Sequence, residues 1–161
     1  HNNLEASENF FPSVCTSHSF SDKVQAIRAA QAAGMDVCSG GIMGLGESIE
    51  DRIDMALSLR DLGIESIPVN MLNPIPGTPM EKYESLTVKE MQRIIAVYRF
   101  ILPKAFIRLA GGRGLMDDKG KACFQSGANA TISGDMLTTA GITVKKDLRL
   151  LEELDYRIKP L

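Results

Sequence analysis

The chain of 161 residues lacks several features that would place it in a readily named structural class. No apolar run approaches the ~20 residues that a membrane-spanning helix needs. A net charge of -2 provides no basic field that would attract nucleic acid or an anionic membrane. The chain is also too short for a complete eight-stranded (βα) barrel, which takes about 250 residues. We therefore expect residues 1–161 to form a single globular domain that binds neither nucleic acid nor a membrane.

Cysteine is scarce, and its spacing excludes several common sites. Cys15, Cys38 and Cys123 are an odd number and include no CxxC pair. This argues against a disulfide framework, a zinc ribbon and a thioredoxin-like motif. The first residues also lack the basic segment followed by an apolar one that marks a signal peptide. These observations predict a reducing, cytoplasmic location.

Helix-like and strand-like segments alternate along the chain. Two helices begin with the capping pairs Ser48/Asp51 and Thr87/Glu90. Pro68 counts against a central position for the strand that contains it. The expected strands are 35–38, 64–69, 105–109 and 128–132, and the expected helices are 21–33, 48–62, 87–102, 117–126 and 144–154. This order predicts a parallel sheet with right-handed helical crossovers.

Four polar residues, Cys38, Asn70, Arg108 and Asn129, each lie near the end of an expected strand and before a glycine-bearing turn. The carboxyl ends of parallel strands open onto one face, where ligands and catalytic groups collect. Polar groups at four successive strand ends fit a barrel mouth better than an open sheet with unpaired edges. The sequence therefore predicts an α/β fold that forms part of a TIM-type (βα) barrel, with a site for a metal and a polar small molecule.

The densest motif is CSGGIMGLGE at residues 38–47. Its glycines allow a tight turn and a close approach of the backbone to a ligand. It is not a P-loop, because no Gly-Lys-Ser/Thr follows. A generic phosphate-binding loop is the simpler interpretation, although the cysteine that precedes the glycines makes the motif more specific.

Each of the other strand ends allows two interpretations. Asn70 can pair with a urea or amide group through its donor and acceptor, or it can satisfy loop backbone. Arg108, between two apolar residues, can point into the mouth toward an anion or form a structural ion pair. Asn129 and the small polar residues after it can hold a carboxylate or cap the strand end.

Taken together, the motifs resemble the biotin synthase family of radical S-adenosylmethionine (SAM) enzymes. The resemblance covers essentially the whole chain and rests on the combination and order of its parts. These parts are NLE at 3–5, FFP at 10–12, CSGGI at 38–42, NML at 70–72, GTP at 77–79, RL at 108–109 and LTT at 137–139. The resemblance implies the carboxy-terminal half of a TIM-type barrel.

In that family a [4Fe–4S] cluster reductively cleaves SAM to a deoxyadenosyl radical, which abstracts hydrogen from dethiobiotin. A sulfide of a [2Fe–2S] cluster is then inserted to form biotin. The resemblance implies that Cys38 and Arg108 are catalytic residues and ligands of the [2Fe–2S] cluster. It also implies a reductant such as flavodoxin or ferredoxin, and it is compatible with a homodimer.

The same resemblance assigns the binding residues. Those for dethiobiotin are Asn3 and Asn70 at its ureido group, and Thr138 and Thr139 at its carboxylate. Those for SAM are Glu5 at the ribose, Lys23 at the carboxylate, and Ile42, Leu72 and Asn73 at the adenine.

The chain departs from the family pattern at three points. The CxxxCxxC motif of the [4Fe–4S] cluster and two further cysteines of the [2Fe–2S] cluster are absent, so we expect them in a first half of the barrel and expect this chain alone to be inactive. Lys23 stands where the family commonly has Arg. A lysine is a point charge, so the bidentate contact of an arginine with the SAM carboxylate would be lost. Ala130 replaces a small hydroxyl residue near Arg108. Cys15 and Cys123 match no ligand position and are interpreted as structural.

Two alternatives remain open. The first is another radical SAM enzyme, of the hydrogenase-maturation or methylornithine-forming type, although those lack a thiolate and an Arg at these strand ends. The second is a non-catalytic half-barrel remnant or binding module.

Overall fold

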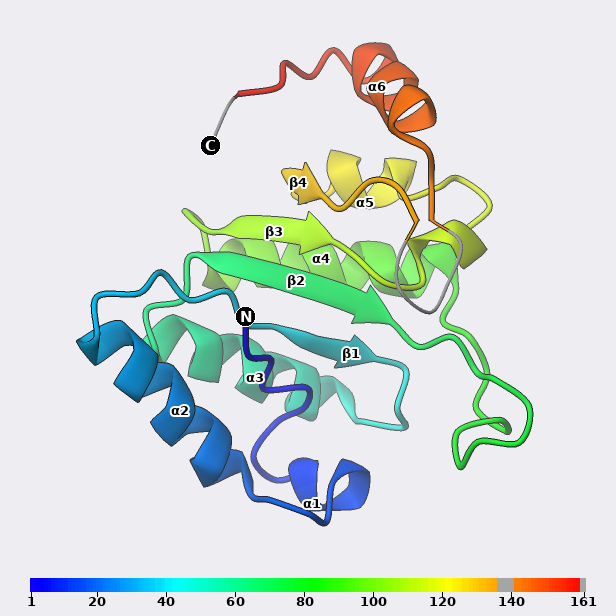
Figure 1. Ribbon diagram of the computed structural model, residues 1–161. Coiled ribbons are helices and arrows are strands. Elements are labelled where there is room, and N and C mark those ends of the chain that lie inside the picture. Colours follow the sequence, from blue (N-terminus) through cyan, green and yellow to red (C-terminus); the bar gives the residue numbers. More distant parts are fainter. Residues whose placement is uncertain (136–140, 160–161) are drawn as a thin grey trace.

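The computed structural model describes residues 1–135 and 141–159 of the chain. Within these residues, four parallel strands form one sheet in the order β1-β2-β3-β4, and the strands point in the same direction in Figure 1. The strands are Gly41–Met43 (β1), Ser66–Met71 (β2), Phe106–Leu109 (β3) and Ala130–Thr131 (β4). The predicted α/β architecture with a parallel sheet is confirmed.

The longer helices begin where the sequence offers a capping box. Ser48 and Thr87 accept backbone hydrogen bonds from the third residue of their helices, as predicted. The preceding helix is capped by Ser19 and not by Ser21, because Asp22 completes the box only from Ser19. The helices are Phe11–Val14 (α1), Phe20–Ala32 (α2), Ile49–Asp61 (α3), Val88–Ile101 (α4), Lys121–Gln125 (α5) and Val144–Glu153 (α6), with a 3-10 turn at Arg113–Leu115 (η1).

The first strand lies later in the chain than predicted. Cys38 does not end a strand: it forms an isolated bridge to Ser66, and β1 begins three residues later, at Gly41. Pro68 lies inside β2, between β1 and β3, which contradicts the expectation that it would avoid a central strand. Ser66 accepts the Ser39 N–H, so strand alternation turns the nitrogen of Pro68 toward the segment before β1. The ladder is interrupted there, between the Cys38–Ser66 bridge and the Gly41–Val69 pair.

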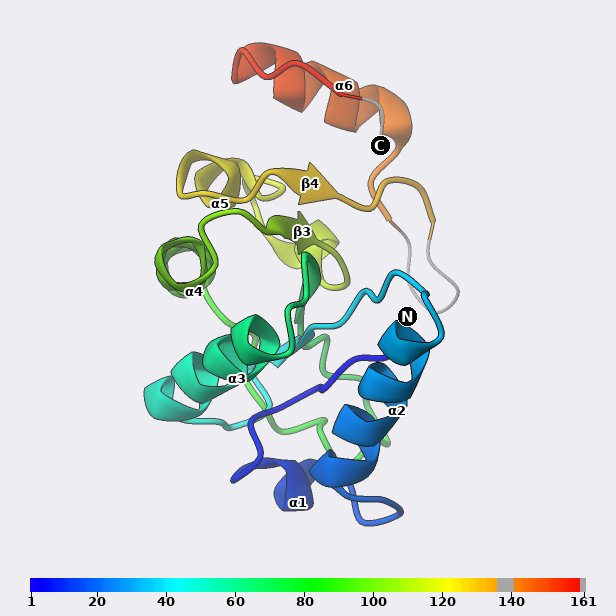
Figure 2. The same ribbon diagram turned by 90° about the vertical axis from the view of Figure 1, so that its left-hand side faces the viewer.

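The sheet is curved, and its two faces differ in burial. Figure 2 shows α5, α4, α3 and α2 in an arc along the outer side of the strands. Outward-facing Ile67, Val69, Ile107 and Leu109 are at most 2% exposed and form the core with these helices. The alternate residues on the inner face are mostly half-buried. This is the architecture of part of a (βα) barrel. None of the helices among the described residues combines the length and apolar character that crossing a membrane requires.

Gly40 allows the close approach of the segment before β1 to β2. A Cβ at this position would collide with the carbonyl oxygen of Pro68. We expect Gly40→Ala to lower the free energy of unfolding by about 2 kcal/mol or more, because backbone cannot move aside as a flexible side chain can. Gly34→Ala is the control, since no atom lies within 4 Å of its Cβ position and only the positive φ of 77° opposes it. Chemical denaturation of both variants measures the difference, and equal losses would contradict the prediction.

Candidate functional site

The structure places Cys38 and Arg108 on the same face of the sheet. Cys38 bridges Ser66, which is in register with Phe106, and Arg108 lies two residues farther along β3. Residues in register in a parallel sheet, and residues two apart along a strand, point to the same side. The thiol and the guanidinium therefore both lie on the inner face, and both residues are half-buried.

The spacing of these two residues suits a small cluster between their side chains. They are separated by two strand spacings across the sheet and two residues along it, which places their Cα atoms about 12 Å apart. A thiolate and a long guanidinium side chain can reach a common inorganic cluster over such a span. A soft thiolate is the usual protein ligand of an iron–sulfur cluster. The thiolate is therefore of the type that binds an iron–sulfur cluster, for which further ligands are required.

Arg108 has few partners of its own on the inner face. No ion pair or side-chain hydrogen bond engages its guanidinium among the described residues, so the structural ion pair considered above is not observed. Its register partner on β4 is Ala130, whose methyl group offers no acceptor. On β2 its register partner is Pro68, and the hydroxyl of Ser66, two residues earlier, is buried and unpaired within the described part of the chain. The site thus contains a cationic side chain and an orphaned hydroxyl, as a polar occupant requires.

One neighbour of Cys38 was not anticipated from the sequence. The His1 Nδ1 atom lies 3.4 Å from the Cys38 Sγ atom. His1 is brought there because Asn2 donates its backbone N–H to the carbonyl of Cys38. Such a contact between residues 37 positions apart has no local sequence signal.

Asn3 and Asn70 lie on opposite sides of the two-residue segment Gly40–Gly41. The Asn3 Oδ1 atom accepts the Gly40 N–H at 3.0 Å, and the Asn70 Nδ2 atom donates to the Gly41 carbonyl at 3.1 Å. Asn70 also accepts the Gly111 N–H at 2.9 Å, which joins β1 to the turn after β3. The backbone-satisfying role considered for Asn70 is therefore observed. An amide has two donors and two acceptor sites, so each side chain keeps capacity for a ligand.

Glu5 and Lys23 approach the site from the segment that precedes β1. Glu5 has a left-handed φ of 69° and exchanges backbone hydrogen bonds with Gly40 and Ile42. Burial raises the pKa of its carboxyl group above the usual value, against the opposing effects of the Asn3 hydrogen bond and the Lys23 charge. The Lys23 Nζ atom donates to the side chain of Asn2 at 3.2 Å. A carboxylate and an ammonium group are thus held near the edge of the sheet beside β1.

Ile42, Leu72 and Asn73 lie near one another at the carboxyl ends of β1 and β2. Ile42 is in register with Asn70 and shares its inward orientation. Leu72 donates its N–H to the carbonyl of Met43, and Asn73 follows it; all three residues are half-buried. Together they offer an apolar wall edged by backbone groups.

Thr138 and Thr139 lie outside the described residues. Sequence reasoning missed a buried cluster around Asp147. Arg113, 4% exposed, donates two hydrogen bonds of 2.8 and 2.6 Å to Asp147. Ser133 donates to the same carboxylate. This cluster joins η1, the end of β4 and α6, and only the tertiary fold brings its members together.

The remaining sequence candidates do not join the site. Asn129 precedes β4 and does not lie near a strand end as predicted; its side chain accepts the Ile107 N–H at 2.8 Å and so satisfies a backbone group of β3. Cys123 is buried, and burial raises the pKa of its thiol to about 12, as suits a structural residue. Cys15 is hydrogen-bonded to Ser17, which lowers the pKa of its thiol. Among the described residues, no three His, Cys, Asp or Glu side chains form a group that could hold a metal ion.

Comparisons with known proteins agree on one family. Residues 68–157 match the Biotin and Thiamin Synthesis associated domain. The chain is 69% identical over 159 residues to biotin synthase of Brachyspira hyodysenteriae, covering 99% of the chain and 48% of that protein. It is 60% identical over 158 residues to biotin synthase 2 of Corynebacterium diphtheriae, covering 98% and 48%. The chain thus spans about half the length of the curated relatives that it matches.

Solved structures show the same fold at lower sequence identity. The crystal structure of methylornithine synthase matches 98% of the chain and 51% of its own chain with a TM-score of 0.79 and 22% identity. HydG, a maturase of the [FeFe]-hydrogenase, matches 96% of the chain and 38% of its own with a TM-score of 0.71 and 19% identity. At these identities the similarity concerns the fold alone.

Proposed function

Because the chain belongs to the family of the Biotin and Thiamin Synthesis associated domain, we propose that it forms half of the active site of a biotin synthase. The reaction is SAM-dependent sulfur insertion into dethiobiotin. The observation that carries the proposal is the placement of Cys38 and Arg108 on one inner face of the sheet. The methylornithine-forming and hydrogenase-maturation alternatives have only the shared fold in their support.

Cys38 and Arg108 are proposed as two ligands of the [2Fe–2S] cluster. When bound, the two clusters and SAM supply a carbon-centred radical and the sulfur atom for insertion. The Cys38 thiolate would bind one iron strongly, whereas the Arg108 side chain would be a weaker ligand, because it has a lone pair for iron only after losing a proton. A weaker ligand suits a cluster that must release sulfur. The remaining ligands and those of the [4Fe–4S] cluster come from outside this chain.

The two asparagines are proposed to hold the ureido group of dethiobiotin. Asn3 and Asn70 bracket Gly40–Gly41, and their backbone hydrogen bonds fix the orientation of both amides. Their remaining donors and acceptors match the carbonyl and N–H groups of a cyclic urea. Thr138 and Thr139 are proposed to bind the carboxylate at the other end of the substrate.

SAM is proposed to lie along β1. The Glu5 carboxylate would accept hydrogen bonds from the ribose diol, and Lys23 would neutralise the SAM carboxylate as a point charge. Ile42, Leu72 and Asn73 would contact the adenine. The partners of the full-length protein are then dethiobiotin and a low-potential reductant such as flavodoxin or ferredoxin.

Glu5 offers a test that separates stability from ligand binding. Burial raises the pKa of the Glu5 carboxyl group in the folded state, so this group ionises first in the unfolded chain as the pH rises. Above the ordinary pKa of the group, its ionisation therefore favours the unfolded state. We expect Glu5→Gln to raise the melting temperature at neutral pH, to leave it unchanged below about pH 4, and to weaken SAM binding about tenfold. Thermal unfolding across pH and calorimetry with SAM measure the two effects. Unchanged SAM affinity would contradict the ribose assignment.

The proposed function is tested in the full-length protein. After anaerobic reconstitution with iron and sulfide, we expect two cluster types by iron content and Mössbauer spectroscopy. With SAM, dethiobiotin and reduced flavodoxin, the reconstituted protein should form biotin and 5′-deoxyadenosine. Two clusters without any biotin would overturn the substrate assignment, and the absence of iron together with no binding of dethiobiotin would indicate a non-catalytic remnant.

A further inference from the structure

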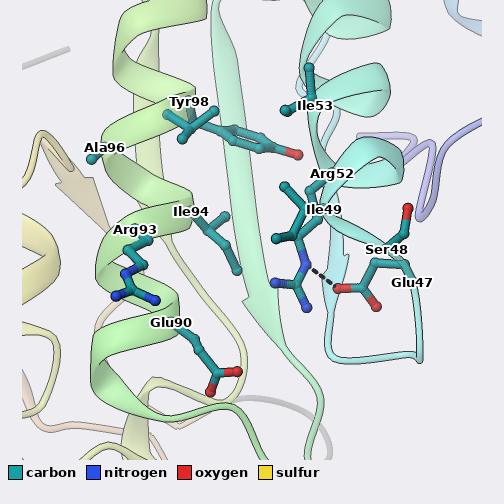
Figure 3. A pocket seen from close by; sticks show the side chains of 11 residues that line it. Glu47, Ser48, Ile49, Arg52, Ile53, Glu90, Arg93, Ile94, Ala96 and Tyr98 are labelled. Atoms are coloured by element: carbon teal, nitrogen blue, oxygen red, sulfur yellow. Dashed lines mark hydrogen bonds and ion pairs between the residues drawn. The ribbon is translucent and has the colours of Figure 1, made fainter.

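A groove between α3 and α4 lies on the outer side of the sheet, opposite the face that carries Cys38 and Arg108. Its volume is about 630 Å³, within the range of about 300–1,000 Å³ that is typical of small-molecule sites. Its apolar walls come from both helices, with Ile49 and Ile53 on α3 and Ile94 on α4 (Figure 3). Because Ile49 is 67% exposed, apolar surface at this groove is open to a ligand.

Tyr98 lies on the buried side of this groove and carries a hydroxyl group without a partner. The residue is 1% exposed, and its hydroxyl makes no hydrogen bond within the described part of the chain. Figure 3 shows this hydroxyl pointing from α4 toward α3. Burial raises the pKa of the hydroxyl above its ordinary value, so it keeps its proton and can donate. Since buried polar groups are nearly always hydrogen-bonded, the unpaired Tyr98 hydroxyl indicates that a polar group of a ligand reaches it.

The arginine side chains of the groove have more free hydrogen-bonding capacity than its carboxylates. Arg52 donates from its Nε atom to Glu47 at 2.7 Å, and no hydrogen bond occupies its two amino groups among the described residues. Glu90 accepts hydrogen bonds from the backbone and the side chain of Thr87, which hold it at the start of α4. Arg93 forms no ion pair within the described part of the chain. The groove therefore complements an anion better than a cation.

We propose that the groove binds a small carboxylic acid in which a short apolar chain joins the carboxylate to a neutral polar group at the far end. The carboxylate binds the amino groups of Arg52, the chain packs against Ile49 and Ile94, and the far end accepts a hydrogen bond from Tyr98. Figure 3 shows Ile94 between the levels of the Tyr98 hydroxyl and the Arg52 guanidinium along the groove. Because the groove and the proposed active site lie on opposite faces of the sheet, this site does not depend on the proposed function.

Two acids that differ only at the far end test this arrangement in the full-length protein. We expect ω-hydroxyhexanoate to bind saturably, and about threefold to tenfold more tightly than hexanoate, because only the hydroxy acid can pair with Tyr98. In Tyr98→Phe this difference should disappear, and Arg52→Gln should weaken both acids about tenfold. Arg60→Gln is the matched control, since Arg60 is an exposed arginine of the same helix outside the groove. Isothermal titration calorimetry measures the affinities. No saturable binding, or a difference that persists in Tyr98→Phe, would refute the proposal.

Thermal unfolding separates a ligand-binding tyrosine from a purely structural one. Without ligand, Tyr98→Phe should leave the melting temperature unchanged or raise it, because the variant loses a buried hydroxyl that has no partner. Tyr156→Phe is the matched control and should lower the melting temperature, since the Tyr156 hydroxyl donates to the carbonyl of Phe124 at 2.9 Å. Saturating ω-hydroxyhexanoate should then raise the melting temperature of the parent protein more than that of Tyr98→Phe. A lower melting temperature for unliganded Tyr98→Phe would show that the hydroxyl already has a partner in the protein, which contradicts the proposal.

Discussion

Replacing Cys38 by Ala in the full-length protein is expected to lower biotin formation by more than about 100-fold while SAM is still cleaved. The expected loss exceeds that from removing a residue that only orients a metal ligand. Cys38 faces the same interior as Arg108. The proposed ligands of the SAM-cleaving cluster are other residues, outside this chain, and the substitution leaves them unchanged. Single-turnover assays of biotin and 5′-deoxyadenosine, together with iron content, measure the effect.

Cys15→Ser is the matched control for this prediction. Cys15 is half-buried like Cys38, but its sulfur contacts Ser17 and His18 and has no place on the inner face of the sheet. We expect normal biotin formation from this variant. If Cys38→Ala instead removed the [4Fe–4S] cluster and kept the [2Fe–2S] cluster, the assignment of Cys38 would be wrong.

Replacing Asp147 by Asn is expected to cost about 3–5 kcal/mol of unfolding free energy. Arg113 and Asp147 are 4% and 3% exposed, and the carboxylate accepts two hydrogen bonds from the guanidinium and one from Ser133. Loss of the negative charge leaves a buried guanidinium without its counter-ion. Urea denaturation of the full-length protein measures the loss.

Two further variants separate this explanation from a general weakness of α6. Glu153→Gln breaks the ion pair between Glu153 and Lys121, whose side chains are 62% and 43% exposed, respectively. This change should lower the free energy of unfolding by less than about 1 kcal/mol. The double variant Arg113→Met/Asp147→Leu removes both buried charges and should recover most of the stability. A small loss for Asp147→Asn, or no recovery in the double variant, would contradict the assigned role.

Local patterns predicted much of the fold. The alternation of helices and strands and the capping boxes at Ser48 and Thr87 were recognised, because each depends on neighbouring residues. The limits of β1 and the place of Pro68 were predicted wrongly. Both depend on where β2 comes into register with the segment around Gly40, which is a contact between residues far apart in the chain.

The candidate site was predicted in outline from its residue types. Asn70 and Arg108 were recognised as polar groups near strand ends, whereas Cys38 precedes β1, and the sequence left the partners of all three open. The structure shows that Asn70 fastens two backbone segments while keeping part of its hydrogen-bonding capacity. The contact of His1 with Cys38 and the Arg113–Asp147 cluster had no local signal at all.

By itself, the sequence determined the class of fold, the capped helices and the family, because these follow from short-range periodicity and from motif order. Only the tertiary structure decided which side chains share a face. A change of one residue in strand register would turn Arg108 from the inner face into the core, and the strands that fix this register are far apart in the sequence. The strand register is set by the packing of Ile67, Val69, Ile107 and Leu109 against the outer helices. This packing leaves the Cys38 thiol and the Arg108 guanidinium on the same inner face.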